Sequence, residues 1–375
     1  MLAGRYTMLL SFILLLAAVH AAEAASPVSP TSEIVVKHSP ESKYETRIKL
    51  ADNELARLIA KGGLRRTSAS LPATDVELIV YAAGTASEYA ADEHGRLYDA
   101  ELKQLLELPP GQRLRLGEAV RAARASHYGQ LLPWDKARKL IPKRATLTVT
   151  DVESGLSFQA QNRAGARHVD AQPLTAADTA IMRRMYGGAW SWKRRAVIVS
   201  AGSYRLAASM HGMPHGGDGI PGNKFAGHFC IHFLGSRTHG SGLVDPEHRL
   251  MVYKAAGQLQ QLFVAAEPET VVRTFIAAVS MEERQLAAAA FTEAGHRQLD
   301  FFFRLRRLDV LAGKRTARLQ AQSDLFTATV PLEINVQQGR SRSSKLVFTF
   351  HLKRSAVYDP WKIELVTLVG REQPR

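Results

Sequence analysis

The only cysteine of the 375-residue chain lies in a stretch that is rich in histidine. Cys230 has His228 two residues before it and His232 two residues after it, and six of the thirteen histidines fall within residues 204–249. A thiol attacks as its thiolate, and a neighbouring imidazole both accepts the proton and orients the attack. This spacing therefore predicts nucleophilic chemistry at Cys230.

The residues around Cys230 have the alternation of a strand. If residues 228–233 are extended, Cys230 and its two flanking histidines lie on one face. Phe229, Ile231 and Phe233 then lie on the other face. We expect this apolar face to anchor the strand in a core.

Two runs upstream of this strand predict a hairpin. Residues 195–200 and 204–209 alternate in polarity around a short Gly-containing turn. The second run leads to His211, which is followed by a Gly- and Pro-rich loop over residues 212–227. We expect this loop to fold back and bring His211 toward Cys230.

The order of these residues resembles the signature of the L,D-transpeptidase catalytic domain, the YkuD family. That signature has a histidine, a spacer, and then Ser/Thr-His-Gly-Cys. Here residues 212–226 separate His211 from the run Gly227-His228-Phe229-Cys230, and the spacer length fits the family. The resemblance implies Cys230 as the acylated nucleophile, His211 as its general base, and His228 as the second motif histidine beside the thiol.

The resemblance also implies a substrate-binding region, with two departures from the family. His232 takes the place of a polar residue next to the acyl-binding pocket, and Gly212 follows the expected base. Gly227 replaces Ser/Thr, and Phe229 replaces the glycine before the nucleophile. A phenylalanine there would narrow the region where backbone N–H groups stabilise an oxyanion.

Two tryptophans precede the predicted hairpin. Trp190 and Trp192 flank Ser191, and a Lys-Arg-Arg run follows at residues 193–195. Aromatic and basic groups together stack on a sugar or clamp a carboxylate. The structural alternative is that both rings cover the edge of the next strand.

We primarily expect a site without a cofactor. The same histidines also allow a second hypothesis, a zinc site. Catalytic zinc takes three protein ligands and leaves one position for water. We expect His168, Asp170, His228 and His232 as the leading ligand set. The full pool of candidate ligands is His168, Asp170, His211, His215, His228, His232 and His239.

The N-terminus has the pattern of a secretory signal. Arg5 precedes an apolar run at residues 8–19, and Ala22-Glu-Ala24 forms a small-x-small cleavage site. This predicts a signal peptide over residues 1–24, a Ser/Pro linker over 25–33, secretion, and no stable membrane span after cleavage. An uncleaved anchor is the alternative.

The formal net charge is +14, and it stays at +14 without residues 1–24 because these contain one arginine and one glutamate. For an exported chain this predicts affinity for peptidoglycan, another acidic wall polymer or a membrane surface. No nucleic-acid motif accompanies the charge, so we do not expect nucleic acid as a partner.

The remaining patterns predict an α+β multidomain protein. Residues 34–143 read as a small α+β module, with helices at 52–60, 98–106 and 116–127 and a strand at 75–81. Residues 144–264 read as a mainly-β domain with a first hairpin at 145–150 and 156–160. A helix begins at Asp245 and Pro246 and continues to about residue 263.

Residues 265–375 combine helices with later strands. Helical spacing at 271–279 and 284–308 precedes three strands, at 325–336, 345–354 and 361–369. This order resembles the NTF2-like α+β cone.

Three functions follow from these observations. The first is an exported cell-wall transferase that performs cysteine acyl transfer on peptidoglycan stem peptides. The second is a zinc-dependent peptidoglycan hydrolase that uses the histidine cluster. The third is a non-catalytic wall-binding envelope protein.

Overall fold

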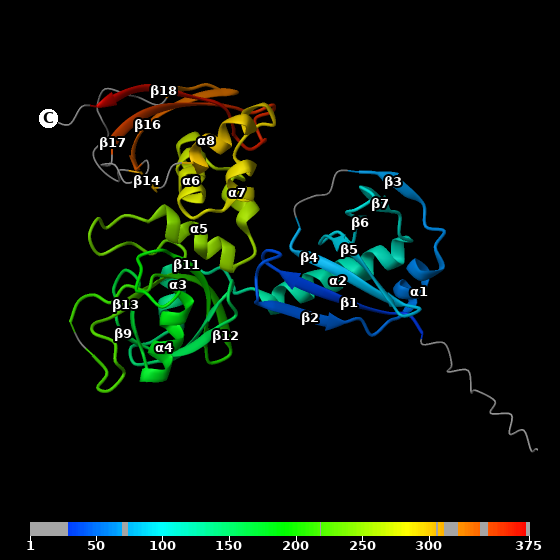
Figure 1. The fold of residues 1–375 in the computed structure, drawn as a ribbon, viewed down its shortest axis with the longest axis horizontal. Coiled ribbons are helices and arrows are strands. Elements are labelled where there is room, and N and C mark those ends of the chain that lie inside the picture. Colours follow the sequence, from blue (N-terminus) through cyan, green and yellow to red (C-terminus); the bar gives the residue numbers. More distant parts are fainter. Residues whose placement is uncertain are drawn as a thin grey trace, which may run out of the picture.

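A computed structural model describes residues 29–69, 74–217, 219–304, 307–310, 322–337 and 344–372. These residues form an α+β protein with three sheets, one of which closes into a barrel (Figure 1). The predicted signal peptide, residues 1–24, lies outside the described part. No helix among the described residues has the length and apolar character needed to cross a membrane.

The first unit is a seven-stranded sheet in the order β2-β1-β4-β5-β6-β7-β3, with two helices packed against it. Its first strand begins at Thr31, within the stretch 25–33 that we expected to be a linker. The elements are β1 (Thr31–Lys37), β2 (Glu45–Lys49), α1 (Glu54–Lys61), β3 (Arg66–Ser68), β4 (Val76–Ala82), β5 (Thr85–Ala91), β6 (Leu97–Asp99), β7 (Gln104–Leu106) and α2 (Pro110–His127).

The predicted helix over 98–106 is wrong. The chain forms the hairpin β6–β7 there, which buries Leu97 and Leu106 in the core. Pro109 and Pro110 follow this hairpin, and Pro110 is the first residue of α2. A proline fits the first helical turn because the N–H that it lacks has no partner within the helix.

The second unit is a closed six-stranded barrel in the order β10-β13-β12-β11-β8-β9. Both predicted hairpins are confirmed as the antiparallel pairs β8–β9 and β11–β12. The elements are α3 (Trp134–Leu140), β8 (Thr146–Asp151), β9 (Ser157–Ala164), β10 (Val169–Pro173), α4 (Ala176–Met185), β11 (Arg195–Ala201), β12 (Tyr204–Met210), β13 (Phe229–His232) and α5 (Pro246–Ala255).

Helix α5 joins the barrel to the third unit. It packs against β11 and β12 on one side and against α6 on the other (Figure 1). The Asp245 side chain accepts a hydrogen bond from the His248 N–H, as an N-cap does. The helix ends at Ala255 rather than near residue 263, because Gly257 turns the chain with a φ of +65°.

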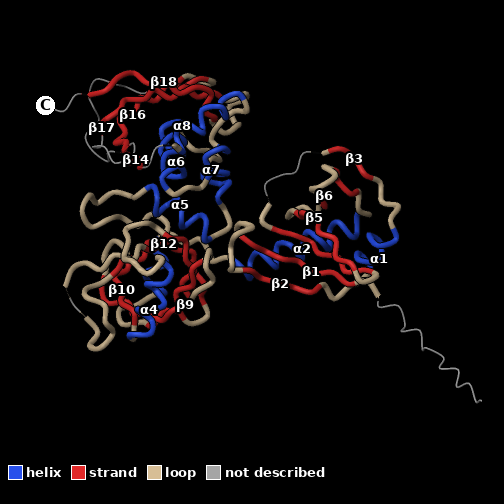
Figure 2. Tube along the Cα trace, viewed as in Figure 1, coloured by secondary structure: helices blue, strands red, loops and turns tan. Residues whose placement is uncertain are grey.

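The third unit is a five-stranded antiparallel sheet covered by helices, and Figure 2 shows those helices between the sheet and the barrel. The three predicted strands are confirmed as β16, β17 and β18, but the second helical stretch is broken into short pieces. The elements are η1 (Leu259–Leu262), α6 (Pro268–Ser280), α7 (Arg284–Ala289), η2 (Ala294–Gln298), α8 (Leu299–Phe303), β14 (Arg307–Val310), β15 (Gln322–Ser323), β16 (Thr327–Gln337), β17 (Ser344–Lys353) and β18 (Lys362–Glu372).

A buried cation ties the last two units together. The Lys254 ammonium on α5 pairs with Glu153 of the barrel and with Glu283 of the third unit. Only 6% of the Lys254 side chain is exposed. The ion pairs therefore fix α5, and the residues that it carries, against the barrel.

Candidate functional site

The candidate site lies on the outer face of the barrel. Phe229, Ile231 and Phe233 join the barrel core, so Cys230 and His232 face the opposite way, as the alternation predicted. That outer face is nevertheless buried, and only 3% of Cys230 is exposed. The Phe229 side chain packs inside the barrel against Phe158 and does not line the thiol.

The loop before β13 folds back on itself. The His215 N–H donates to the His228 carbonyl at 3.0 Å, and the His228 N–H donates to the His215 carbonyl at 2.8 Å. Gly227 has a φ of +103°, and a Cβ there would lie 2.4 Å from the His215 carbonyl oxygen. The closure of the loop therefore requires glycine at position 227. Asp218 of this loop lies outside the described residues.

This closure places His215 against the thiol. The Cys230 Sγ lies 3.4 Å from Nε2 of His215, and Nδ1 of the same ring lies 3.0 Å from the Met213 carbonyl oxygen. When Nδ1 donates its proton to that carbonyl, Nε2 presents a lone pair to the thiol. Burial raises the pKa of the Cys230 thiol, and the nearby Asp170 charge raises it further. The sulfur therefore keeps its proton near pH 7. The lone pair of His215 Nε2 lies within hydrogen-bond reach of that proton.

His211, the base implied by the resemblance, lies farther from the Cys230 sulfur than His215 does. One of its nitrogens lies within 4.8 Å of both the Cys230 sulfur and a His215 nitrogen. Burial lowers the pKa of His211 to about 3, so its imidazole is neutral near pH 7. The half-exposed Trp192 ring covers it, with ring centroids 4.6 Å apart.

Two further residues of the expected substrate region have packing roles. Trp190 packs edge-on against Phe225, with centroids 5.3 Å apart, on the side of the barrel core. Gly212 lies against the Tyr186 ring, which a Cβ at position 212 would approach to 2.3 Å. Only Trp192 of the two tryptophans therefore covers the histidines.

Strand β10 brings an acidic residue to the thiol. Asp170 lies opposite Cys230 in the β10–β13 register. The Asp170 Oδ1 has the Nε2 atoms of His239, His168 and His228 at 3.0, 3.2 and 3.8 Å. Burial acts to raise the pKa of Asp170, but contacts with His168 and His239 outweigh it and hold the pKa at about 2. The carboxylate is therefore charged near pH 7.

Stacked imidazoles form the floor of the site. His232 stacks on His248 with centroids 3.8 Å apart and on His168 at 4.4 Å. Ser209 Oγ lies 2.8 Å from His248 Nδ1. Burial lowers the pKa of His232 and of His248, so both rings are neutral. Sequence reasoning gave His248 no role, although it lies within the histidine-rich stretch.

The donor atoms fall into two groups that share Cys230. His168, Asp170, Cys230 and His239 place their donor atoms within 4.8 Å of one another. A second group combines Cys230 with His211 and His215. His228 and His232, two of the four zinc ligands that we expected, are outside both groups.

Comparisons of the chain with family models, with curated proteins and with solved structures find no match. The likeness to the L,D-transpeptidase motif therefore stays a prediction.

Proposed function

We propose that the protein is an exported cysteine acyl-transfer enzyme that acts on the stem peptides of peptidoglycan. One observation carries the proposal. Cys230 Sγ lies 3.4 Å from His215 Nε2, and the Met213 carbonyl orients that imidazole. A nucleophile, a base and a group that orients the base are the minimal set for covalent cysteine catalysis.

The reaction follows from this contact. The Cys230 proton passes to His215 Nε2 as the sulfur attacks a peptide carbonyl carbon, and a tetrahedral intermediate forms. The C–N bond then breaks, and the leaving amine takes the proton from His215. An acceptor amine or water attacks the resulting thioester and gives its proton to the same imidazole, which returns it to the thiol. Each proton is thereby accounted for within one Cys–His pair.

His211 acts as a positioning residue in this account. Its ring centroid lies 5.2 Å from that of His215, and Trp192 covers both rings. A neutral, buried ring there supports His215 in the orientation that meets the thiol. The resemblance gives the role of base to His211, and variants at both positions separate the two assignments.

The rest of the chain fits a wall enzyme. The net charge of +14 favours an acidic polymer, and the predicted signal peptide delivers the chain to it. Trp192 and His239, each about half exposed, lie at the accessible edge of the site. We further propose that the barrel is an L,D-transpeptidase-like domain and that residues 265–375, where helices pack on one antiparallel sheet, form an NTF2-like domain.

A stem-peptide assay tests the proposal. Metal-free protein is incubated with a disaccharide tetrapeptide, quenched in acid, and examined by intact-mass spectrometry. We expect a thioester adduct on the wild-type protein, none on Cys230→Ala, and a much slower appearance on His215→Ala than on His211→Ala. Turnover of the stem peptide by Cys230→Ala would overturn the proposal.

A further inference from the structure

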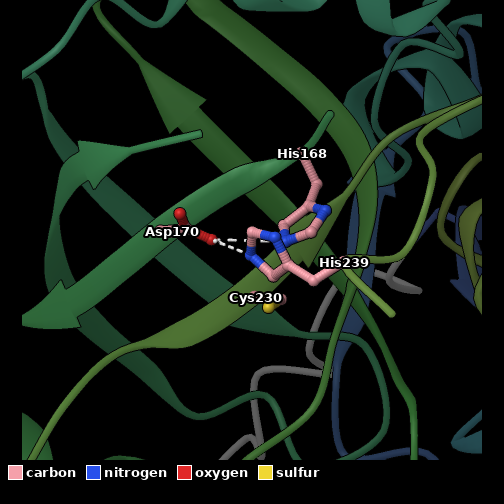
Figure 3. A group of neighbouring side chains, drawn as sticks. All are labelled: His168, Asp170, Cys230 and His239. Carbon is pink, nitrogen blue, oxygen red and sulfur yellow. Dashed lines mark hydrogen bonds and ion pairs between the residues drawn. The ribbon is translucent and has the colours of Figure 1, made fainter. Parts of the chain in front are cut away.

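Cys230 has a second set of neighbours that the acyl-transfer reaction does not use. Figure 3 shows His168, Asp170 and His239 gathered around the thiol, with both imidazoles directed at the Asp170 carboxylate. His168 and Asp170 come from β10 and its approach, Cys230 from β13, and His239 from the loop that follows β13.

We propose that His168, Asp170, Cys230 and His239 bind a transition-metal ion of the zinc class. We also propose that the bound ion withholds the thiol from reaction, and this second part rests on the cysteine function proposed above.

His168 is oriented as a metal-binding histidine is. Its Nδ1 lies 2.7 Å from the Arg237 carbonyl oxygen, so that nitrogen carries the proton. Metal-binding histidines commonly donate their other N–H to a carbonyl in this way. The residue is 99% buried, and Nε2 has no hydrogen-bond partner among the described residues, although Asp170 Oδ1 lies 3.2 Å away. His168 Nε2 and Asp170 Oδ1 are therefore two potential ligand atoms 3.2 Å apart, a distance that one bound metal ion would bridge.

The spacing of the donors fits one tetrahedral ion. Bond lengths of 2.0–2.1 Å at the tetrahedral angle place neighbouring N and O ligands roughly 3.3 Å apart. Oδ1 of Asp170 lies 3.2 Å from Nε2 of His168 and 3.0 Å from Nε2 of His239. The sulfur completes the set within 4.8 Å of the other donors. Small movements of these side chains would admit the ion.

Charge favours this group over the second one. A thiolate and the Asp170 carboxylate together balance a divalent ion in a buried position. His211, His215 and a thiolate would leave a net positive charge without a carboxylate ligand. Two imidazoles, a carboxylate and a thiolate also form a donor set that suits zinc.

Four protein ligands leave no open position for a catalytic water, which argues against a zinc hydrolase. On binding, the metal–sulfur bond forms as the thiol proton leaves to solvent, because the ligand is the thiolate. The lone pair of the sulfur then binds the metal and cannot attack a carbonyl carbon. The ion therefore acts as a reversible block, and His239, which is 52% exposed, lies where the ion can enter.

The test uses Co²⁺ as a spectroscopic probe on the full mature chain after treatment with EDTA. We expect the visible bands of a tetrahedral Co²⁺ site, a thiolate-to-cobalt charge-transfer band in the near ultraviolet, and loss of both when Zn²⁺ is added. His239→Ala and His168→Ala should weaken binding at least about tenfold, since even outer-shell partners of a metal cost that much. Cys230→Ala should lose the charge-transfer band.

His215→Ala is the matched control, because His215 touches the same thiol without belonging to the metal group. Its Co²⁺ affinity should stay within about threefold of wild type, which corresponds to less than 1 kcal/mol. Because the His239 side chain is half exposed, His239→Ala should fold as the wild-type protein does. Circular dichroism checks the fold of this variant. No tetrahedral spectrum, or equal affinity in His239→Ala and wild type, would overturn the site.

A labelling experiment separates the two proposals. Equimolar Zn²⁺ should protect Cys230 from acylation by a carbapenem in the wild-type protein but not in His239→Ala. Labelling of wild type at the same rate with and without Zn²⁺ overturns the block. If metal-free protein is never labelled while the Co²⁺ spectrum is present, the acyl-transfer function fails and the metal site stands.

Discussion

Substitution of Gly227 by serine, the residue type that the L,D-transpeptidase motif has at this place, should damage this site. A Cβ at position 227 would lie 2.4 Å from the His215 carbonyl oxygen, whereas real Cβ atoms essentially never come closer than 3.0 Å. The backbone must therefore move by about 0.6 Å. The φ of +103° is also strained for any residue with a side chain.

The magnitude follows from two contributions. Holding a non-glycine residue in such a conformation costs about 1–3 kcal/mol. The two backbone hydrogen bonds between His215 and His228 contribute about 0.5–1.5 kcal/mol each, and the displacement weakens both. A total of about 2–6 kcal/mol lowers the equilibrium constant between the closed and the open loop by roughly 30- to 20,000-fold, since 1.4 kcal/mol is a factor of ten. His215 leaves the thiol when the loop opens.

The assay is the rate of carbapenem acylation of Cys230, followed by intact-mass spectrometry on metal-free protein. Gly217→Ser is the matched control, because a Cβ at Gly217 meets nothing within 4 Å. We expect acylation of Gly227→Ser to slow by at least about 30-fold, and that of Gly217→Ser to match wild type. Equal rates for Gly227→Ser and wild type would refute the link between this loop closure and the reactivity of the thiol.

Three further predictions concern stability, measured by urea unfolding. Phe229→Ala should cost about 3–5 kcal/mol because the ring is fully buried in the barrel, and a loss below about 1 kcal/mol would contradict its inward direction. Lys254→Met should cost about 3 kcal/mol because Glu153 and Glu283 lose their buried cation. Unchanged stability would contradict the role of these ion pairs in holding the last two units together. Burial holds the pKa of His127 at about 4, below its ordinary 6.5, so the unfolded state binds more protons between these values. The contribution of His127 is therefore complete above pH 6.5 and falls by about 2 kcal/mol between pH 7 and pH 5; His127→Asn should lose that part of the pH dependence, and an unchanged profile would contradict its burial as a neutral ring.

Local patterns predicted the parts of the fold that depend on local chemistry. The alternation of residues 228–233 indicated the direction of Cys230, because a strand with one apolar face has only one orientation in a core. Thr175 and Asp178 show the same local determination at the start of α4, where both hydrogen bonds of the capping box are present. The prediction of a helix over residues 98–106 was wrong because their apolar residues lie at the two ends. This pattern fits a helix and a short hairpin equally well.

The partners of the thiol could not be read from the sequence in the same way. Asp170 reaches Cys230 only through the register of β10 against β13, which joins residues sixty positions apart. His248 arrives on α5, whose packing depends on the third unit. His215 rather than His211 contacts the sulfur, because the loop closes between His215 and His228, and the closure depends on Gly227.

The central claim is that the contact between His215 and Cys230 activates the thiol. The most direct measurement is the rate at which metal-free protein forms a carbapenem adduct, detected as an intact-mass shift, in wild type, Cys230→Ala, His215→Ala and His211→Ala. We expect an adduct on wild type, none on Cys230→Ala, and a greater loss of rate in His215→Ala than in His211→Ala. No adduct on wild type, or an undiminished rate in His215→Ala, would contradict the claim.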